Sequence, residues 1–414
     1  MQRLAIISYH TSPLVQPGTG EGGGMNVYVK QLASALARLG TTCDVYTRAY
    51  SPSLPASITV EPGFVLHYVP AGPLSAVSKL DLLEYIDEFT ENVLERIRMS
   101  PDRIPDVIHA NYWLSGITGH ALKHKLEVPL VTTFHTLEKI KAKNRAVPDD
   151  DISEKLRIEE ESRIINCSDQ VLASCEVEAR EISSLYGLDR SRVSIVPLGV
   201  DHAFFSPGNR DMARKAIGLP TSGKMVLFVG RIQPLKGADI AVESFAKIAK
   251  RVPDAFLVMV GGPSGPFGAG EIYKIKKVVA KERLTHRVYF FDPQPHEVLS
   301  SFYRASDVGL VPSRTESFGL VALEAAACGV PVVASDVGGL KTLVEHGASG
   351  YLVTNRTANE FARYLVKVLE DPALAKPLQI GASSLSRSYR WRDTALRLQD
   401  VLTELTAKEL LVCG

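Results

Sequence analysis

Short apolar runs alternate with amphipathic stretches along nearly the whole sequence, and this alternation restricts the possible folds more than any other feature. A short apolar run predicts a strand buried on both faces, as in parallel sheets that helices cover on both sides. The predicted strands of the first half are Leu4–Ser8, Cys43–Thr47, Phe64–Val69, Val107–His109, Leu130–Phe134, Val171–Ala173 and Val193–Val196. We therefore expect an α/β fold in which helices fill the segments between parallel strands.

The alternation restarts after a turn-rich break, Pro197–Asp201. The second round has strands at Met225–Val229, Phe256–Val260, Val288–Phe291, Val308–Val311 and Val332–Ala334, with helices near 237–250, 271–283, 295–305 and 320–328. A chain of 414 residues also exceeds the size at which one core usually stops growing. We predict two doubly wound, Rossmann-like domains, 1–199 and 200–389. The sequence leaves open whether the last helix, within 390–414, packs back on the first domain.

Charge and cysteine content narrow the possible partners. The 47 Lys and Arg residues nearly balance the 46 Asp and Glu residues, which removes the electrostatic argument for nucleic acid or an anionic membrane as a partner. No apolar run approaches the ~20 residues of a membrane span. The five cysteines form no C-x-x-C pair and leave an odd count, so the sequence supports neither a disulfide framework nor a zinc site. We expect a protein of the cytoplasm.

Two cations, Arg231 and Lys236, follow a predicted strand and precede a predicted helix. Ligands of doubly wound sheets bind beyond the carboxyl ends of the strands, so two such domains facing across a cleft would place the active site in that cleft. The backbone N–H groups of a helix N-terminus attract an anion, and two cations beside them suit a diphosphate. The alternative is a pair of solvated cations in a loop.

Two glutamates, Glu316 and Glu324, lie at the next strand-to-helix transition. If the segment were helical throughout, 1.5 Å per residue would set them ~12 Å apart, too far for the ~5–5.5 Å carboxylate pair of a retaining glycosidase. We infer that they hold different parts of one extended ligand, Glu324 a ribose and Glu316 the hydroxyls of a sugar. The backbone of Phe318, Gly319 and Leu320 would face phosphate. Alternatively, one glutamate caps the helix and the other is a surface residue, although a buried Glu324 would need a partner.

Gly230-Arg231 with Lys236, together with Glu316-x7-Glu324, resembles the donor site of the retaining glycosyltransferases of the two-domain GT-B fold, family 4. The resemblance implies a nucleotide diphosphate sugar as co-substrate, with no cofactor and no catalytic metal. It implies that Arg231 and Lys236 bind the diphosphate. Where related enzymes often carry an arginine between two prolines near the base, this chain has Gln294. The base preference therefore stays open, with UDP-N-acetylglucosamine as the favoured donor.

Four segments of the first half, His10–Leu14, Gln16–Gly20, Gly23–Val29 and His109–Gly116, resemble the D-inositol 3-phosphate glycosyltransferases of mycothiol biosynthesis. Sucrose-phosphate synthases, which use a hexose phosphate acceptor, are similar but less closely. The resemblance implies that Gly24 approaches the donor phosphates. The acceptor residues that it implies are His10, Asn26, Lys79, Tyr112, Thr136 and Arg157. A phosphomonoester carries nearly two charges, which Lys79 and Arg157 suit. The register around Arg157 stays open, because its helix aligns with that of the family in two ways.

His135 ends a predicted strand, so its side chain is expected at the carboxyl edge of the sheet. The resemblance implies that this histidine contacts the transferred sugar, while a phosphate oxygen of the donor takes the acceptor proton in a same-face substitution. We predict that His135 positions and stabilises the substrate without acting as a general base. With Arg231, Lys236 and Glu316 it forms the predicted catalytic set. A histidine with a purely structural role is the alternative.

Two motifs favour other functions. Gly18, Gly20 and Gly23 form a G-x-G-x-x-G pattern, which would indicate a nicotinamide-dependent oxidoreductase. About ten residues with two prolines separate it from the preceding strand, so we interpret the match as coincidental. Asp149–Asp151 contains an Asp-x-Asp of the kind that holds a metal ion on a diphosphate. We interpret it as a solvated turn before a helix. A sugar-nucleotide-binding protein without activity is a third alternative, and the family suggests a homodimer.

Overall fold

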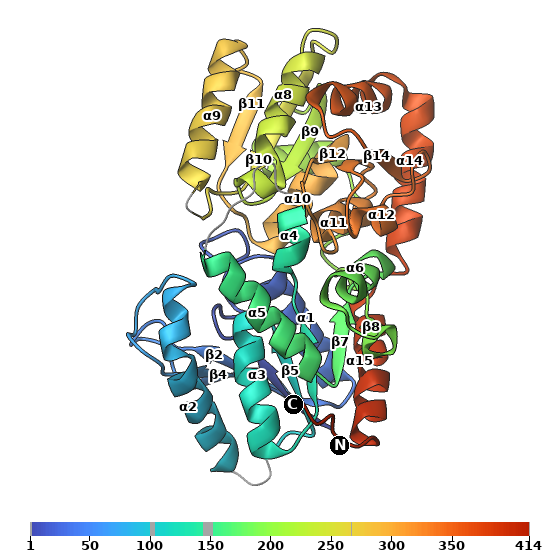
Figure 1. Cartoon of the computed structure of the whole chain (residues 1–414). Coiled ribbons are helices and arrows are strands. Elements are labelled where there is room, and N and C mark those ends of the chain that lie inside the picture. Colours follow the sequence, from blue (N-terminus) through green and yellow to red (C-terminus); the bar gives the residue numbers. More distant parts are fainter. Residues whose placement is uncertain (1, 100–103, 144–151, 266, 414) are drawn as a thin grey trace. The chain divides into compact units, whose positions relative to one another are not determined.

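The computed structural model describes residues 2–99, 104–143, 152–265 and 267–413 (Figure 1). The chain forms two compact units. The first comprises Met1–Val15, Gly24–Pro197 and Trp391–Gly414, and the second comprises Gln16–Gly23 and Leu198–Arg390. The chain thus leaves the first unit near residue 197 and returns to it with its last helix.

The first unit is built on an eight-stranded sheet with the order β3-β4-β2-β1-β5-β6-β7-β8. Its strands are β1 (Arg3–Ile7), β2 (Thr42–Arg48), β3 (Ser57–Glu61), β4 (Phe64–Val69), β5 (Val107–Asn111), β6 (Leu130–Thr133), β7 (Gln170–Ala173) and β8 (Val193–Ile195). All neighbours run parallel except β3 and β4, which are antiparallel. The expectation of parallel strands alone is wrong at this edge, because β3 is mostly solvent-accessible and lacks an apolar run.

Helices of the first unit bury apolar faces against the sheet and one another. They are α1 (Gly24–Arg38), α2 (Ile86–Arg98), α3 (Trp113–Leu126), α4 (Glu138–Lys143), α5 (Ile152–Cys167), α6 (Glu176–Tyr186) and α15 (Trp391–Thr406), with short η1 (Asp81–Tyr85) and η3 (Arg190–Arg192). On α1, Val29, Leu32 and Leu36 are buried on one face. Gly40 follows this helix with φ 91°, a conformation that favours glycine.

Helix α15 brings the end of the chain back to the first unit, where it packs against α1. The ring of Trp391 is buried and lies 6.2 Å from that of Tyr28, so it anchors this helix by packing. The hydroxyl of Thr394 donates to the carbonyl of Pro197 at 2.8 Å, just where the chain leaves this unit. The first unit is therefore complete only with residues from both ends of the sequence.

The second unit holds a six-stranded, fully parallel sheet with the order β11-β10-β9-β12-β13-β14. Its strands are β9 (Lys224–Val229), β10 (Ala255–Val260), β11 (Val288–Phe291), β12 (Val308–Val311), β13 (Val332–Ser335) and β14 (Gly350–Val353). Its helices are α7 (Arg210–Ala216), η4 (Pro234–Lys236), α8 (Ala238–Ile248), α9 (Gly268–Lys281), α10 (His296–Ala305), α11 (Leu320–Ala327), α12 (Leu340–Leu343), α13 (Ala358–Glu370) and α14 (Pro372–Ser386).

Both sheets are doubly wound, as predicted, and each has one point where the strand order reverses. In the first unit, β1 lies between β2 and β5, and in the second, β9 lies between β10 and β12. The loops that follow two such central strands diverge and leave a crevice at the carboxyl edge, where ligands bind. The loops after β1 and β5, and those after β9 and β12, are therefore the places to look for a site.

Two further expectations can be compared with the fold. Strand β1 ends at Ile7 and α1 begins at Gly24, so the strand does not turn directly into the helix as a dinucleotide fingerprint requires. The expectation that the cysteines are unconnected is wrong for one pair, because a disulfide joins Cys167 and Cys413. Among the described residues, no helix is both long and apolar enough to cross a membrane.

Candidate active site

The crevice of the second unit joins Lys236, after β9, to Glu316, after β12. Lys236 Nζ donates to Glu316 Oε2 at 2.7 Å, and the hydroxyl of Ser313 lies 3.3 Å from the same oxygen. The backbone N–H of Arg314 donates to the carbonyl of Leu235 at 2.9 Å, which fastens the two loops together. The side chains of Lys236 and Glu316 are 26% and 17% exposed, so both groups can reach a ligand.

The backbone of Glu316 is fixed by two glycines after β13. The N–H of Gly339 donates to the carbonyl of Glu316 at 3.0 Å. Gly338 has φ 47°, and a Cβ there would lie only 1.8 Å from that carbonyl oxygen. Only glycine fits at this position, so the loop that carries Glu316 is held rigidly against its neighbour.

Gly319, Leu320 and Phe318 form the start of α11, as the sequence predicts. Gly319 has φ 103° and caps a helix whose first amides have no acceptor within the helix. Phe318 is buried, with its ring 5.9 Å from that of Tyr389. An oriented set of N–H groups therefore lies one turn from Glu316, ready for an anion.

Glu324 is buried within α11 and has the partner that its burial demands. The hydroxyl of Tyr303 donates to Glu324 Oε2 at 2.8 Å, and Nε2 of His296 lies 3.7 Å from Oε1. Burial raises the pKa of Glu324, while His296 and Tyr303 act in the opposite direction. Both partners come from α10, and no local motif predicts this pairing.

The glycine loop Gln16–Gly23 belongs to the second unit and contacts the loop after β11. Gln16 Nε2 donates to the carbonyl of Pro293 at 2.8 Å, and a Cβ on Gly23 would lie 3.7 Å from the guanidinium of Arg231. Gln294 donates to the carbonyl of Asp292 at 2.9 Å, within its own loop. The glycine loop Gln16–Gly23 therefore lies next to the Arg231 side chain.

In the first unit, His135 lies just beyond β6 in a left-handed conformation with φ 61°. Its Nε2 lies 2.9 Å from Asn111 Oδ1, and its ring is 4.9 Å from that of Tyr28. Burial, with a smaller effect of His109, lowers the pKa of His135 to about 3. His109 itself lies behind in β5, fully buried, with Nε2 2.8 Å from the hydroxyl of Thr133. His135 is therefore a neutral imidazole, and His109 supports the sheet beneath it.

Two cations lie over the ring of Tyr112 at the end of β5, and a third, Lys141, interacts with this tyrosine electrostatically. The guanidinium of Arg157 lies 5.0 Å from the ring centroid and the ammonium of Lys79 lies 5.7 Å from it. Burial would raise the pKa of Tyr112, but Arg157, Lys141 and Lys79 outweigh it and lower that pKa. Tyr112 has φ 79°, an uncommon conformation for a non-glycine residue that often marks a functional site. The sequence reading missed Lys141, which lies on α4.

Arg157 is buried and held by three groups. It contacts Glu161 Oε1 at 2.7 Å, Glu138 Oε2 at 2.9 Å and the carbonyl of Thr136 at 2.8 Å. Arg163, the other arginine of α5, is exposed and pairs with Glu160. The structure therefore places Arg157, not Arg163, beside Thr136.

Asn26 lies in the first turn of α1, two residues after Gly24, and is buried. Its Nδ2 donates to the hydroxyl of Thr11 at 2.8 Å and to the carbonyl of Ser12 at 2.7 Å. The ring of His10 lies 4.7 Å from that of Tyr112. The loop after β1 is thus tied to α1 and to the cationic cluster of Lys79, Lys141 and Arg157.

The predicted turn at Asp149–Asp151, which contains the Asp-x-Asp pattern, lies outside the described residues.

Comparison with known proteins identifies the class of enzyme to which this chain belongs. The family described as "Glycosyl transferases group 1" matches residues 209–383, and "Glycosyltransferase Family 4" matches residues 22–204. The chain is a glycosyltransferase of the GT-B fold. The oxidoreductase alternative is therefore wrong.

Individual relatives narrow the class further. "D-inositol 3-phosphate glycosyltransferase 2" of Catenulispora acidiphila is 40% identical over 97% of this chain and 94% of its own. "D-inositol 3-phosphate glycosyltransferase" of Acidothermus cellulolyticus is 42% identical over 98% of this chain and 91% of its own. The structure of sucrose-phosphate synthase from Thermosynechococcus elongatus is 32% identical, with TM-score 0.89 over 98% of this chain and all of the other. The chain belongs to the family 4 glycosyltransferases that include these relatives.

The buried histidines predict how acid affects the first unit. The pKa of His109 and that of His135 are each lowered from 6.5 to about 3, chiefly by burial. Between these values the unfolded chain binds more protons, so stability is lost as the pH falls below about 6.5. Each histidine contributes at most about 1.4 kcal/mol per pH unit. We expect His109→Gln to make this loss shallower.

Urea unfolding followed by tryptophan fluorescence measures this, because both tryptophans, Trp113 and Trp391, belong to the first unit. His286→Gln, at an exposed position of the second unit, is the matched control and should keep the wild-type slope. A His109→Gln variant whose stability falls with pH as steeply as the wild type would contradict the assignment.

Proposed function

We propose that this enzyme transfers a sugar, with retention, from a nucleotide diphosphate sugar to a phosphorylated polyol. The favoured donor is UDP-N-acetylglucosamine and the favoured acceptor is 1D-myo-inositol 3-phosphate. The observation that carries the proposal is the cluster of Lys79, Lys141 and Arg157 around Tyr112. The printed names of relatives at 40 and 42% identity support the choice of acceptor.

The cationic cluster suits a phosphomonoester for a physical reason. Three cations face one tyrosine, while Glu138 and Glu161 neutralise part of their charge. The positive charge that remains attracts a phosphate, whose oxygens would accept charge-assisted hydrogen bonds. A guanidinium fixed by two carboxylates and a carbonyl also loses little side-chain entropy when a ligand binds. A neutral polyol offers none of these gains.

The donor residues of the second unit suit a diphosphate sugar. Arg231 and Lys236 supply positive charge, and the N-terminus of α11 supplies oriented N–H groups. Glu316 would accept hydrogen bonds from sugar hydroxyls while Lys236 holds its carboxylate in place. Glu324 keeps a carboxylate for a ribose, although Tyr303 already occupies one of its oxygens.

His135 is unsuited to act as a general base. A group with a pKa of about 3 accepts protons poorly at neutral pH. In the proposed step, the acceptor hydroxyl oxygen bonds to the anomeric carbon as the bond from that carbon to the diphosphate oxygen breaks. The hydroxyl proton passes to an oxygen of the departing phosphate. His135 positions the sugar, and the donor cations stabilise the charge that develops on the diphosphate.

A second acceptor class has its own support. The sucrose-phosphate synthase structure is 32% identical to this chain and matches it with TM-score 0.89. A hexose phosphate would present the same phosphate to the cationic cluster. The deciding measurement is the release of nucleotide diphosphate with UDP-N-acetylglucosamine or UDP-glucose and with inositol 3-phosphate, fructose 6-phosphate or free inositol. Turnover with fructose 6-phosphate but not inositol phosphate would sink the first choice, and turnover with free inositol alone would sink both.

Lys79→Ala tests the phosphate subsite. Loss of one charge-assisted contact worth about 1.5–3 kcal/mol should raise KM for the phosphorylated acceptor by about 10- to 100-fold. KM for the donor should stay unchanged, because Lys79 lies beside Tyr112 in the first unit, whereas the donor residues Arg231, Lys236, Glu316 and Glu324 belong to the second. Lys143→Ala, at an exposed lysine of α4 in the same unit, is the matched control. Equal KM values for Lys79→Ala and wild type would exclude this lysine from the subsite.

Glu316→Gln and Lys236→Ala test the donor chemistry. Each removes an interaction with the reacting sugar or diphosphate, so we expect kcat/KM to fall by about 10²- to 10³-fold. Glu282→Gln, at an exposed glutamate of the same unit, should behave as wild type. Unchanged turnover in the first two variants would contradict the enzymatic role of this pair, and absence of turnover in the wild type would favour the alternative of a binding protein without activity.

A further inference from the structure

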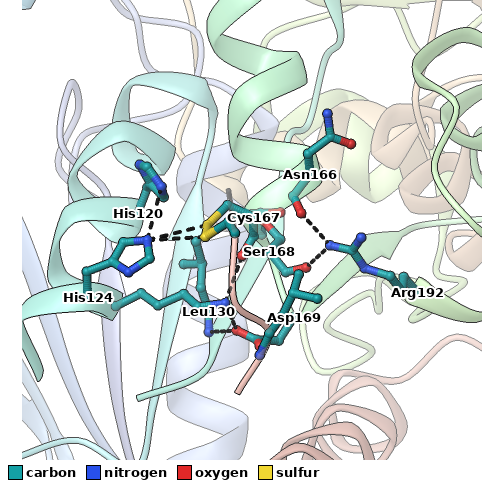
Figure 2. A network of polar contacts seen from close by, with 12 residues as sticks. His120, His124, Leu130, Asn166, Cys167, Ser168, Asp169 and Arg192 are labelled. Carbon is teal, nitrogen blue, oxygen red and sulfur yellow. Dashed lines mark hydrogen bonds and ion pairs between the residues drawn. A yellow bond between two sulfur atoms is a disulfide. The ribbon is translucent and has the colours of Figure 1, made fainter. Parts of the chain in front are cut away.

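Four potential metal ligands come together in the first unit, apart from the residues of the candidate active site. They are His120, His124, Cys167 and Cys413, and their ligand atoms all lie within 4.8 Å of one another. Figure 2 shows His120 and His124 beside the sulfur of Cys167. Two imidazoles and two sulfurs form the ligand set of a tetrahedral zinc site.

Three parts of the fold bring these side chains together: α3, α5 and the segment after α15. His120 and His124 are four residues apart on α3, which places both on one face of the helix. Cys167 is the last residue of α5, and Cys413 lies in the segment after α15. The disulfide spans 246 residues with Cα atoms 5.1 Å apart. As thiols, the same two residues would stay close enough to share one ion.

The distances around His124 fit a common central ion. Its Nε2 lies 3.3 Å from Nε2 of His120, 3.5 Å from Sγ of Cys167 and 3.2 Å from Sγ of Cys413. Zinc–nitrogen bonds of about 2.0–2.1 Å and zinc–sulfur bonds of about 2.3 Å give tetrahedral edges of about 3.3 Å between nitrogens and about 3.5 Å between nitrogen and sulfur. A neutral imidazole nitrogen has either one proton or one lone pair and satisfies only one of these neighbours. A shared cation would satisfy them all.

Surrounding contacts hold the two cysteine backbones in place. The carboxylate of Asp169 accepts from Lys123 Nζ at 2.8 Å, from the N–H of Leu130 at 2.7 Å and from the N–H of Leu411 at 2.9 Å. Lys123 also donates to the carbonyl of Cys167 at 2.9 Å. Arg192 donates to the carbonyls of Asn166 and Ser168, on either side of that cysteine (Figure 2). These contacts preorganise both sulfurs, as the supporting groups of metal sites do.

The charges beside the cluster also favour thiolates. Lys123 and Arg163 lie next to it, and positive neighbours promote loss of the thiol proton. Nη1 of Arg163 lies 3.2 Å from Nδ1 of His120, the ring nitrogen opposite the one that faces His124. Metal binding at Nε2 would leave the proton on Nδ1, so Arg163 would have to release this nitrogen. The Arg163 side chain is exposed and would keep its ion pair with Glu160, so moving it away from His120 costs little free energy.

We propose that, in its dithiol form, this chain binds one Zn²⁺ through His120, His124, Cys167 and Cys413. Binding forms two zinc–sulfur and two zinc–nitrogen bonds and releases one proton from each thiol. The site lies where β6 and β7 begin, because Leu130 and Asp169 belong to it, whereas His135 and Tyr112 lie where strands end. The ion would therefore tie the chain after α15 to α3 and α5, and it has no part in sugar transfer.

The test uses the full chain purified with a trialkylphosphine, which reduces a disulfide to two thiols and becomes the phosphine oxide. We expect about one zinc per chain by elemental analysis, together with thiolate charge-transfer and tetrahedral d–d absorption after Co²⁺ replaces zinc. Zinc should also raise the unfolding temperature of the reduced chain. Sugar transfer by the folded, zinc-free enzyme should equal that of the loaded enzyme.

Variants assign the ligands. His124→Gln and Cys413→Ser should each weaken zinc binding by more than about a hundredfold, since even outer groups contribute about 10- to 100-fold. His124 is exposed, so its replacement leaves the packing intact. Cys175→Ser, at a helix N-cap where serine is favoured, and His286→Gln are the matched controls. A reduced wild type that binds no zinc, an oxidised chain that binds it equally well, or ligand variants with wild-type affinity would overturn the proposal.

Discussion

Parallel strands end at a common edge, and that constraint organises this molecule. In each unit the chain order reverses beside one central strand, so two loops diverge at the edge and leave room for polar groups. Lys236 and Glu316 meet across one such reversal, although 80 residues separate them in the sequence. Tyr112 and His135 occupy the corresponding edge of the other sheet. The strand order therefore determines where polar side chains meet in each unit, and the identity of those side chains then determines the chemistry.

Buried charge is used differently in the two units. Arg157 is enclosed by Glu138 and Glu161, and burial of such a group is tolerable only when it is paired and hydrogen-bonded. The arrangement fixes a cation in one geometry at the cost of flexibility. Lys236 and Glu316 are paired but remain partly exposed, so a ligand can compete for either partner. One unit therefore offers a rigid anchor and the other an adjustable pair.

The sequence predicted much of this and missed the rest for physical reasons. The apolar runs predicted most strands of both sheets, because buried strands need continuous apolar faces, whereas the short β14 and the mostly solvent-accessible β3 were missed. Strand ends indicated the carboxyl edges of the two sheets, one of which carries Arg231 and Glu316 and the other His135. Lys141, Tyr303 and the meeting of Cys167 with Cys413 could not be predicted, because they depend on how distant elements pack. The i, i+4 pair His120 and His124 was the one local signal of the cysteine cluster, and by itself it indicates nothing specific.

The return of α15 to the first unit has a consequence for how the chain is made. The second unit is in effect an insertion, since Leu198–Arg390 must be synthesised before Trp391 can reach Tyr28. At about 5–20 residues per second, roughly 190 residues take on the order of 10–40 s. During that interval the apolar face of α1 that meets α15 has no partner from its own chain. The first unit can therefore complete its fold only after nearly the whole chain has been synthesised, and the exposed face of α1 needs shielding until then. Two consecutive domains would have no such requirement, because the first could fold before the second is made.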